Sequence, residues 1–224
     1  MNGPGPGPAE AFDAVVLAGG RSARLGGVPK ALLEIAGRTL LERTLDVLDG
    51  ARRIAVVGPP ELAAVLARRP AAEGRLLLTR EDPPFAGPAA GIAAGVAALA
   101  APAPAGADDG GQAPLTLLLA CDMPGLAGLP QHLLAAVRHH PEAGLWLPVD
   151  ATGREQQLAC CARTSALAAA VAAAGGAAGA GGLSVRKLLA PLAAVHVPLP
   201  AAGTTEDIDT WADAARFGIA RPAP

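Results

Sequence analysis

Two short segments carry the residue types that chemistry on phosphate groups requires. The first runs from Leu17 to Lys30 and reads L-A-G-G-R-S-A-R-L-G-G-V-P-K. Glycines let a backbone approach a phosphate chain closely, and successive backbone N–H groups bind anions. Arg24 and Lys30 add full positive charges, which stabilise the charge that grows on a transferring phosphoryl centre. The second segment, L-A-C-D-M-P, places Asp122 after an apolar stretch, where a carboxylate can hold Mg²⁺ that bridges to substrate phosphates.

Neither of two common phosphate loops explains the first segment. A P-loop has lysine directly after glycine and before Ser or Thr, whereas Lys30 follows Pro29. The dinucleotide fingerprint G-x-G-x-x-G, between a strand and a helix, is absent from this segment. A tight turn explains Gly19 and Gly20 alone, but it does not explain their combination with Arg24 and Lys30.

Strands that alternate with helices must position these segments. Apolar runs predict strands at 12–17, 53–57, 75–79, 115–120, 145–148, 157–161 and 195–197. Helical spacing predicts helices at 39–48, 60–69, 87–100, 130–140, 164–174, 184–189 and 205–217, with a flexible link at 175–182. We therefore expect a three-layer, Rossmann-like α/β fold with a mostly parallel central sheet. Ligands of such sheets bind outside the carboxyl ends of the strands, where Gly19 and Asp122 fall.

Composition excludes several classes of function. The 224 residues contain 18 Lys and Arg against 20 Asp and Glu, a formal net charge of −2. This balance excludes a broad basic surface for nucleic acid and a polybasic membrane anchor. Three cysteines with no C-x-x-C argue against a disulfide framework and a zinc site. We therefore expect neither nucleic acid nor a membrane among the partners, and a cytoplasmic location.

The chain reads as one domain with a tail at each end. Residues 1–11 alternate Gly and Pro, which predicts disorder rather than a signal peptide. We expect a single domain over 12–218 and a C-terminal tail over 219–224. The long uncharged stretch 85–107 is broken by prolines, so we interpret it as a helix and a loop rather than a membrane span.

The pattern L-A-G-G-x-S-x-R-x-G-x-x-x-K resembles the signature of nucleotidyltransferases of the molybdenum cofactor guanylyltransferase (MobA-like) type. The resemblance is close over residues 12–50 and weaker to about residue 216. It implies a nucleotidyltransferase fold, in which Leu17, Ala18, Gly19, Gly20 and Lys30 bind the nucleotide. It also implies that Asp122 contacts the nucleotide and is the magnesium ligand. Arg24, Lys30 and Asp122 are the candidate catalytic residues.

The same resemblance implies the substrates. GTP would be the donor, Mg²⁺ the cofactor and a molybdopterin-type cofactor the acceptor, with release of pyrophosphate. Transient contact with a molybdoenzyme or a cofactor-delivery protein would follow. The alternatives are transfer from CTP to the same cofactor, transfer to a sugar phosphate, a catalytically silent homologue that binds nucleotide or pterin, and a plain scaffold.

A third segment, R-E-D-P-P-F-A-G-P-A-A-G from Arg80 to Gly91, resembles the family's acidic residue followed by G-P-x-x-G, which contacts the nucleoside. Gly87 would open a helix whose N-terminus faces the ligand. The acidic role falls to Glu81 or Asp82, and we favour Asp82. A surface loop is the alternative explanation of this carboxylate.

The segment D-I-D-T-W-A-D resembles the family's late N-x-N-T-P-E-D stretch or the D-x-D-T-P-E-D form of related enzymes. Asp209 is thus a candidate second metal ligand or pterin contact, although a helix start also explains the acidic residues. Asp207 and Asp209 favour a cytidylyl donor, whereas the Gly19-Gly20 pair favours a guanylyl donor. The stretch 57–60 lacks the Asn that many guanylyltransferases carry there.

The acceptor side has the least specific signal. In G-R-E-Q-Q-L, we propose Arg154 and Gln157 as the residues that face an acceptor phosphate. A solvated turn between two strands is the alternative. Together, the motifs favour a magnesium-dependent transfer of a nucleoside monophosphate.

Overall fold

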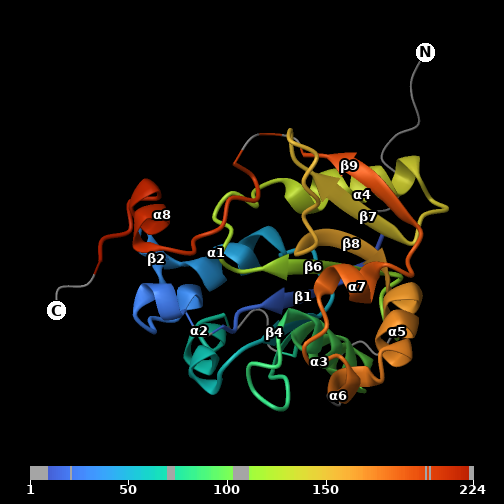
Figure 1. Ribbon diagram of the computed structural model, residues 1–224, viewed down its shortest axis with the longest axis horizontal. Coiled ribbons are helices and arrows are strands. Elements are labelled where there is room, and N and C mark those ends of the chain that lie inside the picture. Colours follow the sequence, from blue (N-terminus) through green and yellow to red (C-terminus); the bar gives the residue numbers. More distant parts are fainter. Residues whose placement is uncertain are drawn as a thin grey trace.

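The computed structural model describes residues 10–20, 22–69, 74–102, 111–199, 201 and 203–221. Most of the predicted N-terminal tail, residues 103–110 between the helix at 87–100 and the strand at 115–120, and the last three residues of the predicted C-terminal tail therefore lie outside the described residues. The described parts form a central sheet with helices on both faces (Figure 1).

Seven strands form the sheet in the order β5-β4-β1-β6-β8-β7-β9. They are β1 (Phe12–Leu17), β4 (Ile54–Val57), β5 (Leu76–Thr79), β6 (Leu115–Ala120), β7 (Leu145–Val149), β8 (Ala159–Arg163) and β9 (Ala194–Pro198). Neighbouring strands pair in parallel except at β8, which is antiparallel to both β6 and β7. The predicted mostly parallel sheet is therefore confirmed.

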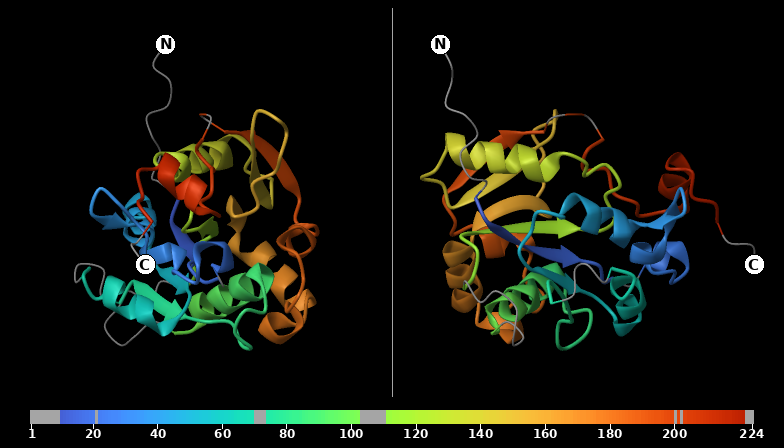
Figure 2. Two further views of the ribbon diagram at one scale, coloured as in Figure 1. Left: turned by 60° about the vertical axis from the view of Figure 1, so that its left-hand side comes forward. Right: turned by 180° about the vertical axis from the view of Figure 1, so that it is seen from behind.

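Helices cover both faces of the sheet, and the sheet separates two hydrophobic cores. They are α1 (Leu40–Val47), α2 (Ala63–Leu66), α3 (Pro88–Ala100), α4 (Leu129–His139), α5 (Thr164–Ala173), α6 (Gly176–Gly179), α7 (Val185–Leu189) and α8 (Trp211–Arg216). Side chains of α1, α2 and α4 belong to the core on one face, and those of α3, α5 and α7 to the core on the other. The strand period of two explains this division, since Val16 faces the first core and its neighbour Val15 the second. The three layers are seen edge-on in Figure 2.

Several predicted elements differ from the observed ones. The predicted 60–69 helix is a 3₁₀ turn, η3 (Pro60–Leu62), followed by the short α2, and the 175–182 link contains α6. The predicted 205–217 helix is wrong over its first half, because α8 begins only at Trp211. The N–H of Ile208 donates to the carbonyl of Asp122 at 3.0 Å, so the backbone there serves a tertiary contact instead of a helix.

A third apolar cluster lies beyond the sheet, beside the hairpin β2 (Glu34–Ile35) and β3 (Arg38–Thr39), which the sequence analysis did not predict. Its buried members come from the segment after β1 and from the C-terminal segment: Leu25, Leu33, Leu40, Ile208, Ala214 and Ile219. Ile219 thus packs against the fold one residue beyond the expected domain end. The cluster joins two parts of the chain that are almost two hundred residues apart, as the proximity of α8 and β2 in Figure 1 shows.

In the described part of the chain, no helix is both long and apolar enough to cross a membrane.

We expect Gly95→Val to destabilise the fold by about 1–3 kcal/mol, the usual cost of overpacking a core. Gly95 lies in α3, where an added Cβ would come within 2.5 Å of Val15 Cγ1 and 3.2 Å of Val57 Cγ2. Urea unfolding measures the free energy directly. Ala97→Val is the matched control, because Ala97 is exposed on the same helix. Equal losses in both variants would contradict the proposed close approach of α3 to the sheet.

Candidate active site

An open cavity of about 970 Å³ lies at the carboxyl edge of the sheet. Hydrogen bonds continue past the ends of the strands and hold the cavity floor together: Ala18 N to Val57 O (2.8 Å), Gly58 N to Thr79 O (2.9 Å), Cys121 N to Leu17 O (3.0 Å) and Ala120 N to Leu158 O (2.9 Å). The segments that follow β1, β4, β5 and β6 therefore start side by side. This is the edge at which open α/β sheets bind ligands.

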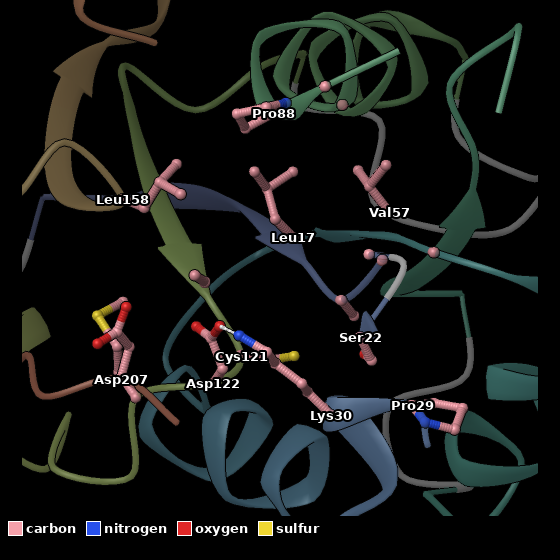
Figure 3. Close-up of a pocket in the computed structure, with 18 of the residues that line it drawn as sticks. Leu17, Ser22, Pro29, Lys30, Val57, Pro88, Cys121, Asp122, Leu158 and Asp207 are labelled. Atoms are coloured by element: carbon pink, nitrogen blue, oxygen red, sulfur yellow. Dashed lines mark hydrogen bonds and ion pairs between the residues drawn. The ribbon is translucent and has the colours of Figure 1, made fainter. Parts of the chain in front are cut away.

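Lys30 lies between two carboxylates in this cavity. Its Nζ is 2.9 Å from Asp122 Oδ2 and also forms an ion pair with Asp209 Oδ1. Figure 3 shows the lysine side chain reaching Asp122 at the end of β6. The structure thus brings together three of the predicted site residues from segments widely separated in the sequence.

Packing fixes the three segments relative to one another. Lys30 begins the 3₁₀ turn η2 (Lys30–Leu32), and Leu33 just after it is buried in the third apolar cluster. Ile208, beside Asp209, is fully buried in the same cluster. The bond from Ile208 N to Asp122 O ties this segment to the end of β6. The ion pairs therefore rest on a hydrophobic support and are not isolated surface contacts.

The electrostatics of the cavity keep Lys30 charged. Burial opposes its charge, but the carboxylates of Asp122 and Asp209 outweigh that effect and raise the pKa of Lys30 above its ordinary value. Asp207 lies in the same cavity. Partial burial, reinforced by the negative charges of Asp209 and Asp122, raises the pKa of Asp207. A site with more carboxylates than cations repels further negative charge unless more cations enter.

Arg24 lies at the rim of this cluster. Its Nη1 is 3.6 Å from Asp209 Oδ2, and its side chain is 75% exposed. An exposed ion pair at that distance contributes little to stability. The Arg24 guanidinium therefore remains accessible to an anion that enters the cavity.

The donor set fits a divalent cation that also binds phosphates. Asp122 and Asp209 supply hard carboxylate oxygens close to one point, which suits Mg²⁺. Within the residues that the structure describes, no group of three or more His, Cys, Asp or Glu side chains is arranged to enclose a metal ion. Magnesium commonly keeps waters and binds through one or two carboxylates plus substrate phosphates, which is the arrangement these residues allow.

The glycine-containing loop folds back over the end of β1. The carbonyl of Ser22 accepts from Leu25 N at 2.9 Å and from Gly27 N at 3.0 Å. Gly26 and Gly27 have φ values of +68° and +84°, a left-handed conformation that favours glycine. Leu17, Ala18, Gly19 and Gly20, which the sequence analysis proposes as nucleotide-binding residues, line the cavity. Arg21 lies outside the described residues.

On the β4–β5 side, the structure favours Glu81 over Asp82. Glu81 lines the cavity, and its Oε1 accepts from the N–H of Phe85 at 2.9 Å. Asp82 is exposed and is not among the lining residues. Our preference for Asp82 is therefore not supported. Gly87, with φ of +104°, lines the cavity and precedes α3 as predicted.

The missing amide near position 58 has a steric explanation. A Cβ on Gly58 would lie 2.6 Å from Leu62 Cδ1 and 3.2 Å from the carbonyl group of Ala18. No side chain fits there without displacing its neighbours. Position 58 therefore contributes only backbone to the cavity wall.

On the opposite side, the connection between β7 and β8 borders the cavity. Arg154 and Gln157 both line it, so the structure brings both predicted acceptor-side residues to its edge. Glu155 lies between them; its Oε2 accepts from Gln157 Nε2 at 3.1 Å and its Oε1 pairs with His196 Nε2 at 3.0 Å. In Figure 3, Leu158 and Asp207 lie on one side of the Lys30–Asp122 pair and Val57 lies on the other.

Sequence reasoning missed several cavity residues. Arg80, Phe85, Glu61 and Glu155 line the cavity but were not proposed as site residues. A signal for Arg80 was present: it directly follows the strand 75–79, as Asp122 follows its own strand. The position of Phe85 depends on a loop conformation that local sequence does not specify.

We expect Asp207→Asn to stabilise the protein at neutral pH. The pKa of Asp207 is higher in the folded than in the unfolded state, so its ionisation favours unfolding. The penalty is absent below the ordinary value of 3.8 and grows as the pH rises above it. Urea unfolding at pH 3 and pH 7 should show the gain at pH 7 alone. The exposed Asp49→Asn is the control, and a gain of equal size at both pH values would contradict the prediction.

Comparisons with known proteins give the family of this fold. The model of the MobA-like NTP transferase domain matches residues 14–196. A probable molybdenum cofactor guanylyltransferase from Methanosarcina acetivorans is 56% identical over 43 residues. That alignment covers 19% of this chain and only 19% of the relative's length.

Solved structures resemble the whole fold. Molybdopterin-guanine dinucleotide biosynthesis protein A from Archaeoglobus fulgidus is 19% identical, with a TM-score of 0.64 over 92% of this chain and 96% of that one. A manganese complex of a Mycobacterium tuberculosis protein is 22% identical, with a TM-score of 0.61 over 94% and 98%. 4-Diphosphocytidyl-2C-methyl-D-erythritol synthase from Anaerococcus prevotii is 14% identical, with a TM-score of 0.60 over 93% and 95%.

The overall similarity to these structures supports the predicted nucleotidyltransferase-type α/β fold, and the family model spans most of the sheet that carries the cavity. This chain belongs to the MobA-like NTP transferase domain family.

Proposed function

We propose that this protein transfers GMP from GTP to a molybdopterin-type cofactor and releases pyrophosphate. The observation that carries the proposal is the position of Lys30, held by Asp122 and Asp209 beside the glycine loop. Family membership supports nucleotidyl transfer, and the short alignment with a guanylyltransferase supports guanine and the cofactor.

In the proposed reaction, a phosphate oxygen of the acceptor forms a bond to the α-phosphorus of GTP. The bond from the α-phosphorus to the oxygen that bridges to the β-phosphorus breaks, and pyrophosphate leaves with that electron pair. Lys30 and Arg24 neutralise phosphate charge, and the loop from residue 18 to residue 27 holds the β- and γ-phosphates. Positioning and electrostatics suffice for such a step, and no covalent intermediate with the protein is needed.

Asp122 and Asp209 would hold Mg²⁺, which supplies charge compensation at the phosphates when it is bound. The manganese complex of a structural relative supports a divalent metal in this fold. Both carboxylates pair with Lys30 in the structure, so the lysine must turn toward a phosphate when the carboxylates bind metal. Metal and nucleotide binding would therefore support each other.

The acceptor would lie on the β7–β8 side of the cavity. Arg154 would pair with the acceptor phosphate, and Gln157 would donate a hydrogen bond to it. This arrangement leaves the β4–β5 side, next to Gly87, for the nucleoside.

Transfer from CTP is the second candidate function. Asp207 and Asp209 both face the cavity, and their motif resembles that of the cytidylyl relatives. 4-Diphosphocytidyl-2C-methyl-D-erythritol synthase is also among the structural neighbours. The base preference therefore has to be measured directly.

The decisive measurement is pyrophosphate release with Mg²⁺, the molybdopterin cofactor and each nucleoside triphosphate in turn. We expect release with GTP, and release with CTP alone would establish the second candidate. Binding of a triphosphate without release would indicate a different acceptor or a silent homologue.

We expect Lys30→Ala and Asp122→Ala each to lower the rate of release by at least about 10²–10³-fold, the usual cost of removing one preorganised charged partner at a reacting centre. Lys187→Ala is the matched control, because Lys187 is exposed on α7 away from the cavity. Near-UV circular dichroism should show an intact fold in all three variants. An unchanged rate of pyrophosphate release in either cavity variant would contradict the proposed mechanism.

A further inference from the structure

Arg80 and Phe85 form a pair at one end of the cavity, and both line it. The guanidinium carbon of Arg80 lies 5.2 Å from the centre of the Phe85 ring, a cation–π distance. Phe85 is 47% exposed and is the one large hydrophobic side chain classed as exposed in the described part of the chain. Neither residue belongs to the charged cluster around Lys30.

The backbone of Phe85 is held in a conformation that bulky residues rarely adopt. Its φ is +64°, in the left-handed region. Its N–H donates to Glu81 Oε1 at 2.9 Å, which fixes the turn. Unusual backbone conformations persist where the surroundings determine them, and they gather at ligand sites. The turn places the aromatic ring against Arg80.

The position of the pair suits a base whose triphosphate lies on the glycine loop. Arg80 directly follows β5, and the bond from Gly58 N to Thr79 O keeps the ends of β4 and β5 adjacent. β5 is two strands away from β1, a separation of about 10 Å at the usual strand spacing. Between the pair and the loop lie Val57 and Gly58, where no side chain reads a base.

We propose that Arg80 reads the base of the donor nucleotide by donating to O6 and N7 of guanine, and that Phe85 is the positioning residue that holds the guanidinium plane. This inference rests on the proposed function and adds its specificity determinant. Arginine pairs in a bidentate manner with these two guanine acceptors. Adenine presents an amino donor in place of O6, and cytosine has no N7, so neither base offers this pair of acceptors.

Calorimetry of the full chain with Mg²⁺ tests this with GTP, 7-deaza-GTP, CTP and inorganic tripolyphosphate. Arg80→Met should lower the affinity for GTP by about 5- to 150-fold, the value of one bidentate contact to a base. The affinity for tripolyphosphate should change by no more than about twofold. The unmodified protein should bind 7-deaza-GTP more weakly than GTP, and Arg80→Met should bind the two equally. Arg138→Met, on the exposed end of α4, is the matched control.

Phe85→Asn tests the positioning role, since asparagine tolerates a left-handed backbone and lacks the ring. It should reduce the ratio of GTP to CTP affinity without changing tripolyphosphate binding. Equal losses for GTP, CTP and tripolyphosphate in Arg80→Met would overturn the proposal and make Arg80 a phosphate ligand. No loss of GTP affinity, or a preference for CTP in the unmodified protein, would also overturn it.

The proposed function fails in a different way. If Lys30→Ala releases pyrophosphate at the normal rate, the transfer mechanism is wrong whatever the base preference. If tight GTP binding depends on Arg80 but no pyrophosphate is released, the proposed recognition of the base by Arg80 is supported and the proposed transfer reaction is contradicted.

Discussion

The charge balance around Lys30 is the constraint on which the rest of the site depends. Asp122 and Asp209 contact one ammonium group, and Asp207 adds a further negative charge nearby. Without a central cation, these carboxylates would repel one another at the end of β6. The same surplus of negative charge would attract a divalent metal, and Lys30 would then be free to pair with phosphate. In the proposed mechanism, the same groups provide both this resting arrangement and the site for metal and nucleotide.

Maintaining this balance requires precise placement of segments far apart in the sequence. The sheet fixes Asp122, because β6 pairs with β1 through its whole length. The third apolar cluster fixes the other two, since Leu33 and Ile208 pack together beside Lys30 and Asp209. The extended stretch before α8 is a consequence. A helix from residue 205 would withdraw the N–H of Ile208 from the carbonyl of Asp122.

Much of this arrangement could be predicted from the sequence. Apolar runs that end in Gly19 or Asp122 place both residues at one sheet edge whenever the strands are parallel. The choice between Glu81 and Asp82 could not be made this way, because adjacent residues in a loop differ only in where the chain turns. The hairpin of β2 and β3 and the late start of α8 escaped prediction for a related reason. Both depend on tertiary contacts rather than on local periodicity.

The cavity extends from Lys30 toward β7 and β8 on one side and toward β4 and β5 on the other, and the residues that line the two sides differ in chemistry. The β7–β8 side is lined by Arg154 and Gln157, whose side chains suit the proposed contact with an acceptor phosphate. On the β4–β5 side, Gly58 leaves no room for a side chain beside Leu62, so the proposed contact with the base falls to a residue farther along the edge. Arg80 is the cation at that place. The steric limit at Gly58 and the proposed role of Arg80 therefore belong to one arrangement: a floor that carries no side chain at position 58 leaves contact with the base to a residue at its end.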